Sequence, residues 1–173
     1  PGDLQYEGGS ADDFAEAYAP TWGRLRAITW PAPGNHEYKT DGAAGYFDYF
    51  GEAAGPRGKG WYSRDLGTWH IVSLNSNCDE AGGCDPESPQ GRWLRADLTA
   101  HRNRCVLALW HHPRWSHGKH GDHDSVAPFL GALHEAGAEV VLTGHDHNYQ
   151  RFEPRRRGGA RDDARGIRQF VVG

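Results

Sequence analysis

Two short motifs carry the residues of this chain that are best suited to metal chemistry. Gly144-His145-Asp146-His147 places two imidazoles one residue apart, so that each can reach a different ion of a metal pair. Gly34-Asn35-His36-Glu37 adds the amide oxygen of Asn35 as a neutral ligand and His36 as a candidate proton donor. Asp3 precedes both motifs, and one carboxylate can hold two ions about 3.5–4 Å apart. Together these residues predict metal-assisted phosphoester chemistry.

Histidines are concentrated in the second half of the chain. Most of the 11 lie between His101 and His147, and the pair at its end follows a short apolar run and a glycine, where a ligand site is expected. His70 alternates with apolar neighbours, so we expect it to be a structural residue with satisfied hydrogen bonds. Surface positions are expected for four others, which are His101, His117, His123 and His134.

Composition limits the classes of partner. At 173 residues the chain is long enough to bury a sizeable core, and we expect residues 1–173 to form a single catalytic domain. The 19 Lys and Arg against 23 Asp and Glu give a net charge of -4, whereas nucleic-acid binders normally show a basic excess. No apolar run approaches the roughly 20 residues that span a bilayer, and no secretory apolar region is evident. Neither a nucleic-acid partner nor a membrane span is therefore expected. The expected partner is a small-molecule phosphoester substrate, and the oligomeric state is left open.

The chain ends and the cysteines bear on completeness and location. Pro1 is the first residue and the chain has no Met, while the last residues read as a strand, so both ends are expected to be truncated. Cys78 and Cys84 flank a polar, glycine-containing loop; a disulfide between them and a pair of reduced thiols both remain open. A disulfide would favour an extracytoplasmic or secreted location. Cys105 begins an apolar run and is expected to be a buried thiol.

Turn signals and periodicity predict alternating helices and strands. Expected helices cover 10–18, 42–50, 88–101 and 125–136, and expected strands cover 26–30, 61–66, 69–74, 105–110, 139–143, 150–153 and 167–172. This alternation predicts an α/β fold, and the hairpin at 61–74 makes the sheet mixed rather than wholly parallel. The strand at 139–143 should deliver His145 and His147 at its carboxyl end.

Four motifs occur in the order found in the calcineurin-like metallophosphoesterases, a superfamily that the chain resembles. They are Gly2-Asp3-x-x-Tyr6, Gly34-Asn35-His36-Glu37, Trp110-His111-His112-Pro113 and Gly144-His145-x-His147. Tyr6 makes the chain look most like the purple acid phosphatase branch. The resemblance covers nearly the whole chain and implies an α/β/β/α sandwich with mixed sheets, here without its first strand.

The resemblance also implies a role for each matched residue and a pair of ions, Fe with Zn, Mn or Fe. The implied ligands are Asp3, Tyr6 and His147 for the first ion and Asp3, Asn35, His111 and His145 for the second. Other implied groups are His36 as an acid outside the ligand set and, from a looser match, His112 and His120 as substrate-orienting imidazoles. The family also has an aspartate in a D-x-[HG] motif upstream of Asp3, which this sequence does not contain, so the first ion is short of one ligand.

The implied reaction is hydrolysis of phosphate monoesters. A water molecule acidified by the two cations would attack phosphorus in line, and His36 would protonate the departing oxygen. No Ser or Cys nucleophile is evident, so no covalent phosphoenzyme is expected. Two alternatives remain open. One is a phosphodiesterase or nucleotidase on the same site, and the other is an inactive metal-binding scaffold, which the absent aspartate motivates.

Overall fold

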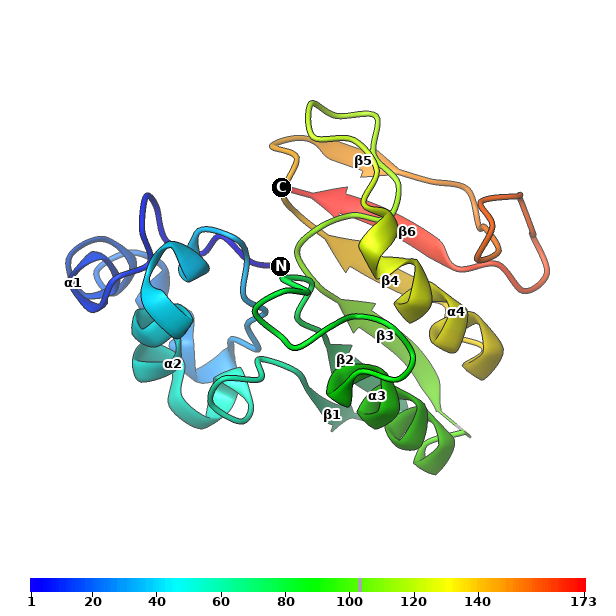
Figure 1. The fold of residues 1–173 in the computed structure, drawn as a ribbon, viewed down its shortest axis with the longest axis horizontal. Helices are drawn as coiled ribbons and strands as arrows, with labels where there is room; N and C mark the ends of the chain where they lie inside the picture. The colour runs from blue at the N-terminus through cyan, green and yellow to red at the C-terminus, as the bar shows by residue number, and fades with distance from the viewer. Residues whose placement is uncertain (103) are drawn as a thin grey trace.

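A computed structural model describes residues 1–102 and 104–173, and a six-stranded mixed sheet lies at its centre (Figure 1). The strands are β1 (Tyr62–Leu66), β2 (Trp69–Ser73), β3 (Cys105–Leu109), β4 (Val140–Thr143), β5 (Tyr149–Arg151) and β6 (Arg168–Val172). Their order in the sheet is β1-β2-β3-β4-β6-β5. The four central strands are parallel, whereas β1 and β5 pair antiparallel with β2 and β6. The α/β class and the mixed sheet expected from the sequence are therefore confirmed.

Two helices cover one face of this sheet, α3 (Pro89–Ala100) and α4 (Ala127–Ala136) (Figure 1). α3 begins after Ser88, whose hydroxyl accepts the N–H of Gly91 at 3.0 Å, and Pro89 fits the first turn because its missing N–H is not needed there. α4 ends at Gly137, which has φ 78°, a left-handed conformation that glycine adopts without strain. None of the described helices combines the length and the apolar character needed to cross a membrane.

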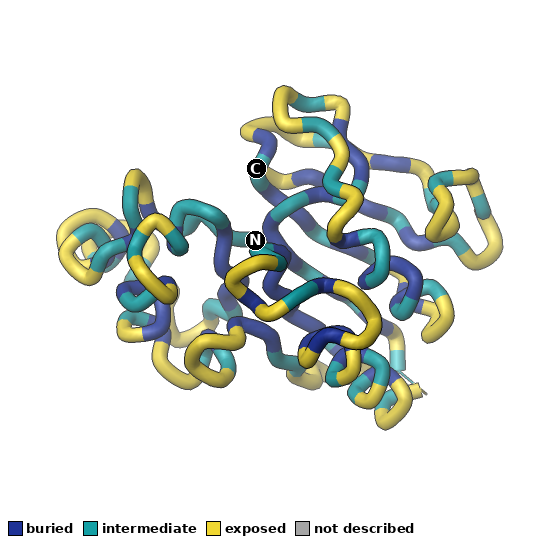
Figure 2. The backbone as a smooth tube through the Cα atoms, in the orientation of Figure 1, coloured by how far each residue is buried: buried dark blue, intermediate teal, exposed yellow. Residues whose placement is uncertain are grey.

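The main hydrophobic core lies between the sheet and these two helices. Val72, Ala108 and Val141 are aligned on neighbouring strands and each is 0% exposed. Leu94 of α3 and Leu130 of α4 belong to the same buried cluster. Figure 2 shows the strands mainly in the colours of buried and intermediate residues. Burial of each such leucine or valine stabilises the folded state by about 1.5–3 kcal/mol. This packing holds the strand ends in place.

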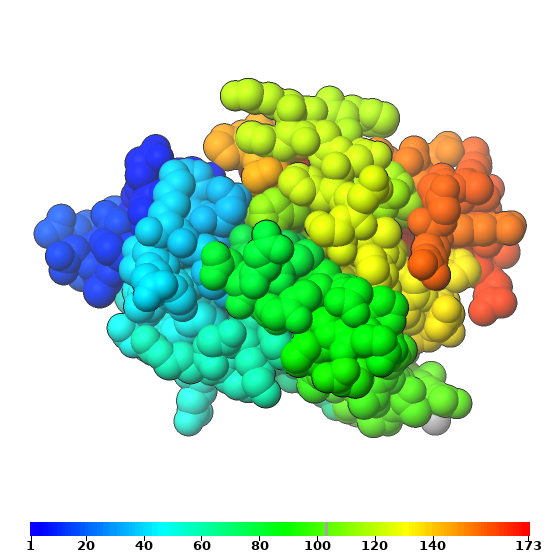
Figure 3. Space-filling model, in the orientation of Figure 1, coloured from blue at the N-terminus to red at the C-terminus, as the bar shows by residue number. Residues whose placement is uncertain are grey.

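The N-terminal part of the chain forms a second, mostly helical cluster beside the carboxyl ends of the parallel strands, and it occupies one side of the molecule in Figure 3. Phe14, Tyr46 and Phe50 form its aromatic core, with ring centroids 5.8 Å apart for Phe14 and Phe50 and 5.4 Å apart for Tyr46 and Phe50. The short elements are α1 (Ala11–Asp13), η1 (Phe14–Tyr18), η2 (Trp22–Ile28), η3 (Glu37–Lys39), η4 (Asp41–Ala43), α2 (Ala44–Phe50) and η5 (Gly51–Ala54); η6 (Asp124–Val126) precedes α4.

One predicted strand is wrong. Residues 26–30, expected as a strand, lie mainly in the 3₁₀ helix η2, and its backbone bonds are local: the N–H of Thr29 donates to the carbonyl of Arg26 at 3.2 Å. Ile28 is 76% exposed, so no neighbouring described strand covers this apolar run. The other predicted helices and strands occur within a few residues of their expected bounds. The described residues supply one sheet and one helical layer of the expected sandwich.

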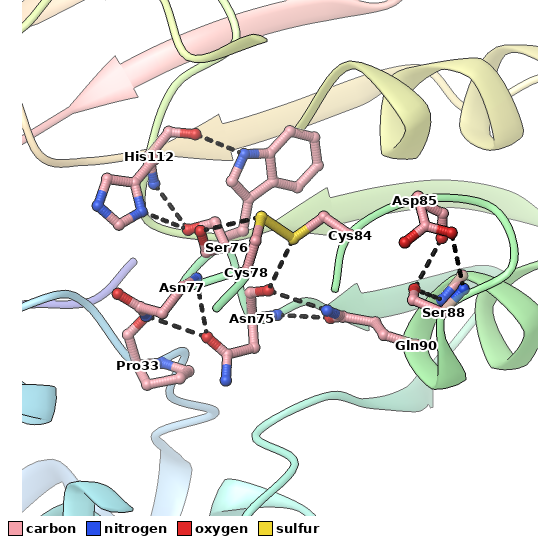
Figure 4. The surroundings of a disulfide bond; sticks show 12 residues. Pro33, Asn75, Ser76, Asn77, Cys78, Cys84, Asp85, Ser88, Gln90 and His112 are labelled. Carbon is pink, nitrogen blue, oxygen red and sulfur yellow. Dashed lines mark hydrogen bonds between the residues drawn. A yellow bond between two sulfur atoms is a disulfide. The ribbon is translucent and has the colours of Figure 1, made fainter. Parts of the chain in front are cut away.

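The cysteines divide into a bridged pair and a free thiol. Cys78 and Cys84 form a disulfide with an S–S distance of 2.06 Å (Figure 4). The expectation that Cys105 is buried is wrong, because this residue is the first of β3 and its side chain is exposed, whereas the next residue, Val106, faces the core. The negative charge of Glu139 raises the pKa of the Cys105 thiol.

Candidate metal centre

The predicted histidine ligands follow the carboxyl ends of two neighbouring parallel strands. His111 comes after β3 and His145 comes after β4, and the N–H of Gly144 donates to the carbonyl of His111 at 2.9 Å, which holds the two loops together. The amino-terminal segment with Asp3 reaches the same edge of the sheet (Figure 1). This edge is where ligands bind in open α/β sheets.

Three polar groups converge on one ring nitrogen of His111. Its Nε2 lies 3.0 Å from Asn35 Oδ1, 3.1 Å from His145 Nδ1 and 3.2 Å from Asp3 Oδ2. Its Nδ1 lies 2.9 Å from the carbonyl oxygen of Pro1, to which it can only donate. A neutral imidazole has a single N–H, so its Nε2 then presents a lone pair to the other acceptors. Several lone pairs aimed at one point favour a cation there, and this donor set fits a metal ion.

Tyr6 and His147 extend this cluster on the other side of Asp3. The Tyr6 hydroxyl lies 3.2 Å from Asp3 Oδ2 and 3.1 Å from His147 Nε2. The six predicted ligands therefore form one connected set, with the Asp3 carboxylate at the junction. Burial and the charge of Asp3 raise the pKa of Tyr6 to about 12, so a phenolate at this position needs the charge of a bound cation.

The backbone is unusual at two of these ligands. Asp3 has φ 50° and His145 has φ 68°, both in the left-handed region that non-glycine residues rarely adopt. Such conformations cost of order 1–3 kcal/mol and persist where the surroundings impose them, often at functional sites. Gly34 is required beside Asp3, because a side chain at position 34 would overlap the Asp3 carboxylate. The Asp3 carboxylate also accepts the N–H of His36 at 3.0 Å.

Glu37 joins the two loops that carry Asp3 and Asn35, a role that the sequence interpretation did not assign. Its side chain is 0% exposed, and its carboxylate accepts four backbone N–H groups. The donors are Gly34 at 2.6 Å, Asp3 at 2.9 Å, Leu4 at 2.8 Å and Gln5 at 3.3 Å. Burial raises the pKa of Glu37, whereas these N–H groups oppose the rise. Its position inside the Gly34–Glu37 motif was the available signal, but the partners are distant in sequence.

Four imidazoles, including that of His111, surround the ring of His145. The ring centroids of His111, His112, His120 and His123 lie 4.9, 4.6, 4.3 and 5.1 Å from it, respectively. Burial, followed by the charge of His111, lowers the pKa of His145 to about 4, and a neutral imidazole is the form that binds metals. His123, expected at the surface, is half-buried, and its ring lies 4.8 Å from that of His112. The loop 111–124 folds back over the strand ends, which spacing alone could not show.

The ring of His112 is held by Ser76, which follows β2 at the same sheet edge (Figure 4). The Ser76 hydroxyl lies 2.9 Å from His112 Nδ1 and also accepts the backbone N–H of His112 at 2.9 Å. The indole N–H of Trp110 donates to the carbonyl of His112 at 2.8 Å. These contacts fix the ring orientation and leave Nε2 without a hydrogen bond to the described residues. Sequence reasoning did not single out Ser76.

Asp146, between the two histidines of its motif, holds the loop that carries His120. One carboxylate oxygen accepts the N–H of His120 at 2.9 Å and the other accepts the hydroxyl of Ser116. Burial would raise the pKa of Asp146, but these bonds hold it below the usual range. Its side chain is 1% exposed and therefore points away from its two histidine neighbours, into the protein. The sequence interpretation assigned it no role.

His36 lies at the edge of the cluster. Its Nδ1 donates to the carbonyl of Glu7 at 2.8 Å, and its ring lies 4.2 Å from the ring of Tyr6. Nε2 has no protein partner among the described residues.

Two clefts adjoin the centre. One, of about 680 Å³, is lined partly by Tyr6 and His147. The other, of about 450 Å³, is lined partly by Asn35 and His112.

The remaining histidines mostly lie where expected. His70 is 1% exposed and both ring nitrogens have hydrogen-bond partners, which confirms its structural assignment. His117 is exposed, and His101 and His134 are partly exposed.

Comparison with known proteins identifies the family. The family model described as calcineurin-like phosphoesterase matches residues 1–149. The chain therefore belongs to the calcineurin-like phosphoesterase family, whose members hydrolyse phosphoric esters. This confirms the resemblance inferred from the four motifs.

Individual relatives support the purple acid phosphatase branch, for which a dimetal centre is implied. Purple acid phosphatase 21 of Arabidopsis thaliana is 29% identical over 178 residues, which cover 89% of this chain and 38% of that protein. Human tartrate-resistant acid phosphatase type 5 is 36% identical over 88 residues, 46% of this chain and 27% of that protein. The fold is similar to purple acid phosphatase PPD1 from yellow lupin seeds, with a TM-score of 0.68 and 18% identity over 84% of this chain and 28% of that one. The chain thus spans less than half the length of these proteins.

Proposed function

We propose that this chain hydrolyses phosphate monoesters at a pair of metal ions. Membership of the phosphoesterase family supports metal-dependent phosphoester hydrolysis. The observation that carries the proposal is the convergence of Asn35, His145 and Asp3 on Nε2 of His111 within 3.0–3.2 Å. That arrangement leaves more lone pairs than protons at one point, which a cation satisfies.

The two ends of the ligand set suit different ions. Tyr6, His147 and Asp3 offer a phenolate, an imidazole and a carboxylate, which favour Fe(III) at the first position. Asp3, Asn35, His111 and His145 would hold the second ion, which we take to be Zn, Mn or Fe. Two bound ions would supply positive charge to the phosphoryl oxygens and acidify a water molecule to near neutral pKa.

The residues around this set act on the substrate and its leaving group. His36 would donate a proton from Nε2 to the departing oxygen, since its Nδ1 is committed to the carbonyl of Glu7. His112, with its ring fixed by Ser76, and His120, beside His145, would orient the phosphate by hydrogen bonds. A positioned acid of this kind contributes typically 10²–10⁴-fold to the rate.

The proposed substrate is a small-molecule phosphoester, and the protein acts outside the cytoplasm. The net charge of -4 gives no general attraction for nucleic acid. The Cys78–Cys84 disulfide supports an oxidising compartment, because disulfides persist outside the reducing cytosol. Residues 1–173 would act as a single catalytic unit.

The test is turnover of 4-nitrophenyl phosphate by protein supplied with iron and zinc, compared with bis(4-nitrophenyl) phosphate. We expect the monoester to have the higher kcat/KM, and His36→Asn to lower kcat for it by about 10²-fold or more with bound metal unchanged. The exposed His117→Ala serves as the matched control and should leave turnover intact. Preference for the diester would identify a phosphodiesterase instead, and bound metal without any turnover would identify a scaffold.

A further inference from the structure

A second histidine–aspartate cluster lies at the opposite end of the sheet from the metal centre. It consists of Asp65 near the end of β1, His70 near the start of β2, and His101, which caps the carboxyl end of α3. One ligand atom from each of these residues lies within 4.8 Å of the other two. Nothing in the proposed phosphatase reaction uses this cluster. It lies at the amino ends of the parallel strands, whereas the substrate clefts lie at their carboxyl ends.

His70 is oriented from both sides. Its Nδ1 lies 2.9 Å from Asp65 Oδ1, and its Nε2 lies 2.7 Å from Asp97 Oδ2. Asp97 is itself held, because its other oxygen accepts the hydroxyl of Ser63 at 2.8 Å. Metal-binding histidines nearly always donate their other ring N–H to a carboxylate or carbonyl, which fixes the ring and its tautomer. Asp97 supplies that partner for His70, and Nδ1 is then the nitrogen left for an ion.

In His101 and Asp65, too, one polar atom is held by another group of the protein. His101 Nδ1 donates to the backbone carbonyl of Asp97 at 2.7 Å, which leaves Nε2 as its free ring nitrogen. Asp65 Oδ2 lies 3.3 Å from the guanidinium of Arg104, which leaves Oδ1 facing His70. Each residue therefore has one polar atom held by another part of the protein. Of the three remaining atoms, His101 Nε2 has no partner among the described residues, and His70 Nδ1 and Asp65 Oδ1 contact each other.

We infer that Asp65, His70 and His101 bind one divalent transition-metal ion, with Zn²⁺ the best match. Two imidazoles and one carboxylate are a donor set that Zn²⁺ uses, with water completing four-coordination. The ion would replace the proton between His70 Nδ1 and Asp65 Oδ1. Asp65 and His101 are partly exposed, with side-chain exposures of 41% and 31%, and they offer an entry path to the buried His70.

Binding requires one movement. The rings of His70 and His101 are stacked, with centroids 3.9 Å apart and planes only 14° from parallel, so their in-plane lone pairs run side by side. A shared ion needs the His101 ring to turn out of this stack. His101 can turn because it is partly exposed, whereas His70 is fixed by two carboxylates. The stack is thus the ion-free arrangement, and its loss is a signature of binding.

The test is Zn²⁺ binding to the full chain, with bound ions counted by elemental analysis after dialysis. Wild-type protein should hold one Zn²⁺ more than Asp65→Asn or His101→Ala. Asp97→Asn should weaken this binding by about 10- to 100-fold, the usual effect of losing the group that orients a ligand. His134→Ala, which changes a histidine on α4, is the matched control and should bind as wild type.

A second measurement separates this ion from the metal centre. In His145→Ala the cluster should still take up Zn²⁺, and the proton resonances of the His70 and His101 rings should shift as the stack opens. Thermal unfolding of each variant without metal checks that it folds. Equal Zn²⁺ stoichiometry and affinity in wild-type, Asp65→Asn and His101→Ala proteins, with no shift of these two rings, would overturn the inference and leave the cluster as an ion-pair contact.

Discussion

Nε2 of His111 lies 3.2 Å from Asp3 Oδ2, and this contact joins the amino-terminal segment to the carboxyl end of β3. Burial would raise the pKa of the Asp3 carboxyl, but the contact with His111, followed by the hydrogen bond from the backbone N–H of His36, holds it well below its usual range. Asp3 also contacts the Tyr6 hydroxyl. The carboxylate therefore lies where the two proposed ion positions meet, which is the place of a bridging ligand.

Asp3→Asn should disrupt the proposed metal pair. The amide keeps the shape of the side chain but removes the negative charge that both ions would share. Loss of a group that only orients a ligand typically lowers activity about 10- to 100-fold. We expect Asp3→Asn to lower kcat/KM for 4-nitrophenyl phosphate by more than this, and the protein to bind fewer ions. Metal analysis alongside kinetics checks this. Full activity with two ions retained would show that Asp3 does not bridge.

Tyr6→Phe tests the identity of the first ion. If Fe(III) binds beside Tyr6, the phenolate should give a visible charge-transfer absorption, and the variant should lose that colour. Because the phenol pKa is raised to about 12 without metal, the band should appear only in iron-loaded protein. Visible spectra of the two proteins, with and without iron, provide the measurement. An active, colourless protein containing only zinc would argue against the purple acid phosphatase branch while leaving the wider family intact.

Glu37→Gln should weaken metal binding although Glu37 contacts no proposed ion. A glutamine has one acceptor oxygen in place of two, and its NH₂ would face backbone N–H groups now bound by the carboxylate. We expect metal affinity to fall by about 10- to 100-fold and the protein to be less stable. Competitive metal titration gives the affinity. Glu135→Gln on the exposed side of α4 is the matched control. Equal metal affinity in both variants would show that Glu37 does not support the metal centre.

Ser76→Ala should impair substrate orientation while leaving metal binding intact. The substitution removes both contacts that the hydroxyl makes with His112. Leaving a buried group without its partner costs about 1–3 kcal/mol, and the freed ring should lower kcat/KM by about 10-fold or more. Ser125→Ala, in the same cleft but without such a contact, is the control. A Ser76→Ala enzyme with unchanged kinetics would show that the orientation of His112 does not matter for turnover.

Stability should depend on acid pH through Asp65. The hydrogen bond from His70 lowers the pKa of this carboxyl from its ordinary value of 3.8. A carboxyl whose pKa is lower in the folded than in the unfolded state stabilises the fold at pH values above 3.8. That contribution is lost as the pH falls through the folded-state pKa. Asp65→Asn should therefore lower Tm at pH 6, and this difference from wild type should shrink progressively as the pH falls below 3.8. A Tm difference from wild type that does not shrink on acidification contradicts this assignment; Asp79→Asn serves as the control.

The fold was largely predictable because its signals are local. The apolar run before His145, the capping Ser88 and the terminating Gly137 each define an element through nearby residues. The error at 26–30 has a physical cause, since a strand needs a neighbour to pair with and sequence periodicity does not show whether one is present. Likewise, Cys105 belongs to an apolar run, but its position as the first residue of β3 decides its exposure.

The candidate ligands could be named from the sequence, but the groups that hold them in place could not. Spacing and motif order pointed to Asp3, Asn35 and His111, which the fold brings together. Glu37 and His123 were not recognised in these roles because their partners lie far away in sequence and are apposed only after folding. Long-range hydrogen bonds to the backbone leave no pattern in a single sequence.

The most direct test of the whole account is metal analysis of purified protein, produced with any coding sequence that precedes Pro1 and offered iron, zinc and manganese. We expect two ions per chain at the centre around Asp3, in addition to any Zn²⁺ at Asp65. His111→Ala should lose at least one of the two central ions. Folded protein that retains no ion at this centre from any of the three metals would contradict the central claim.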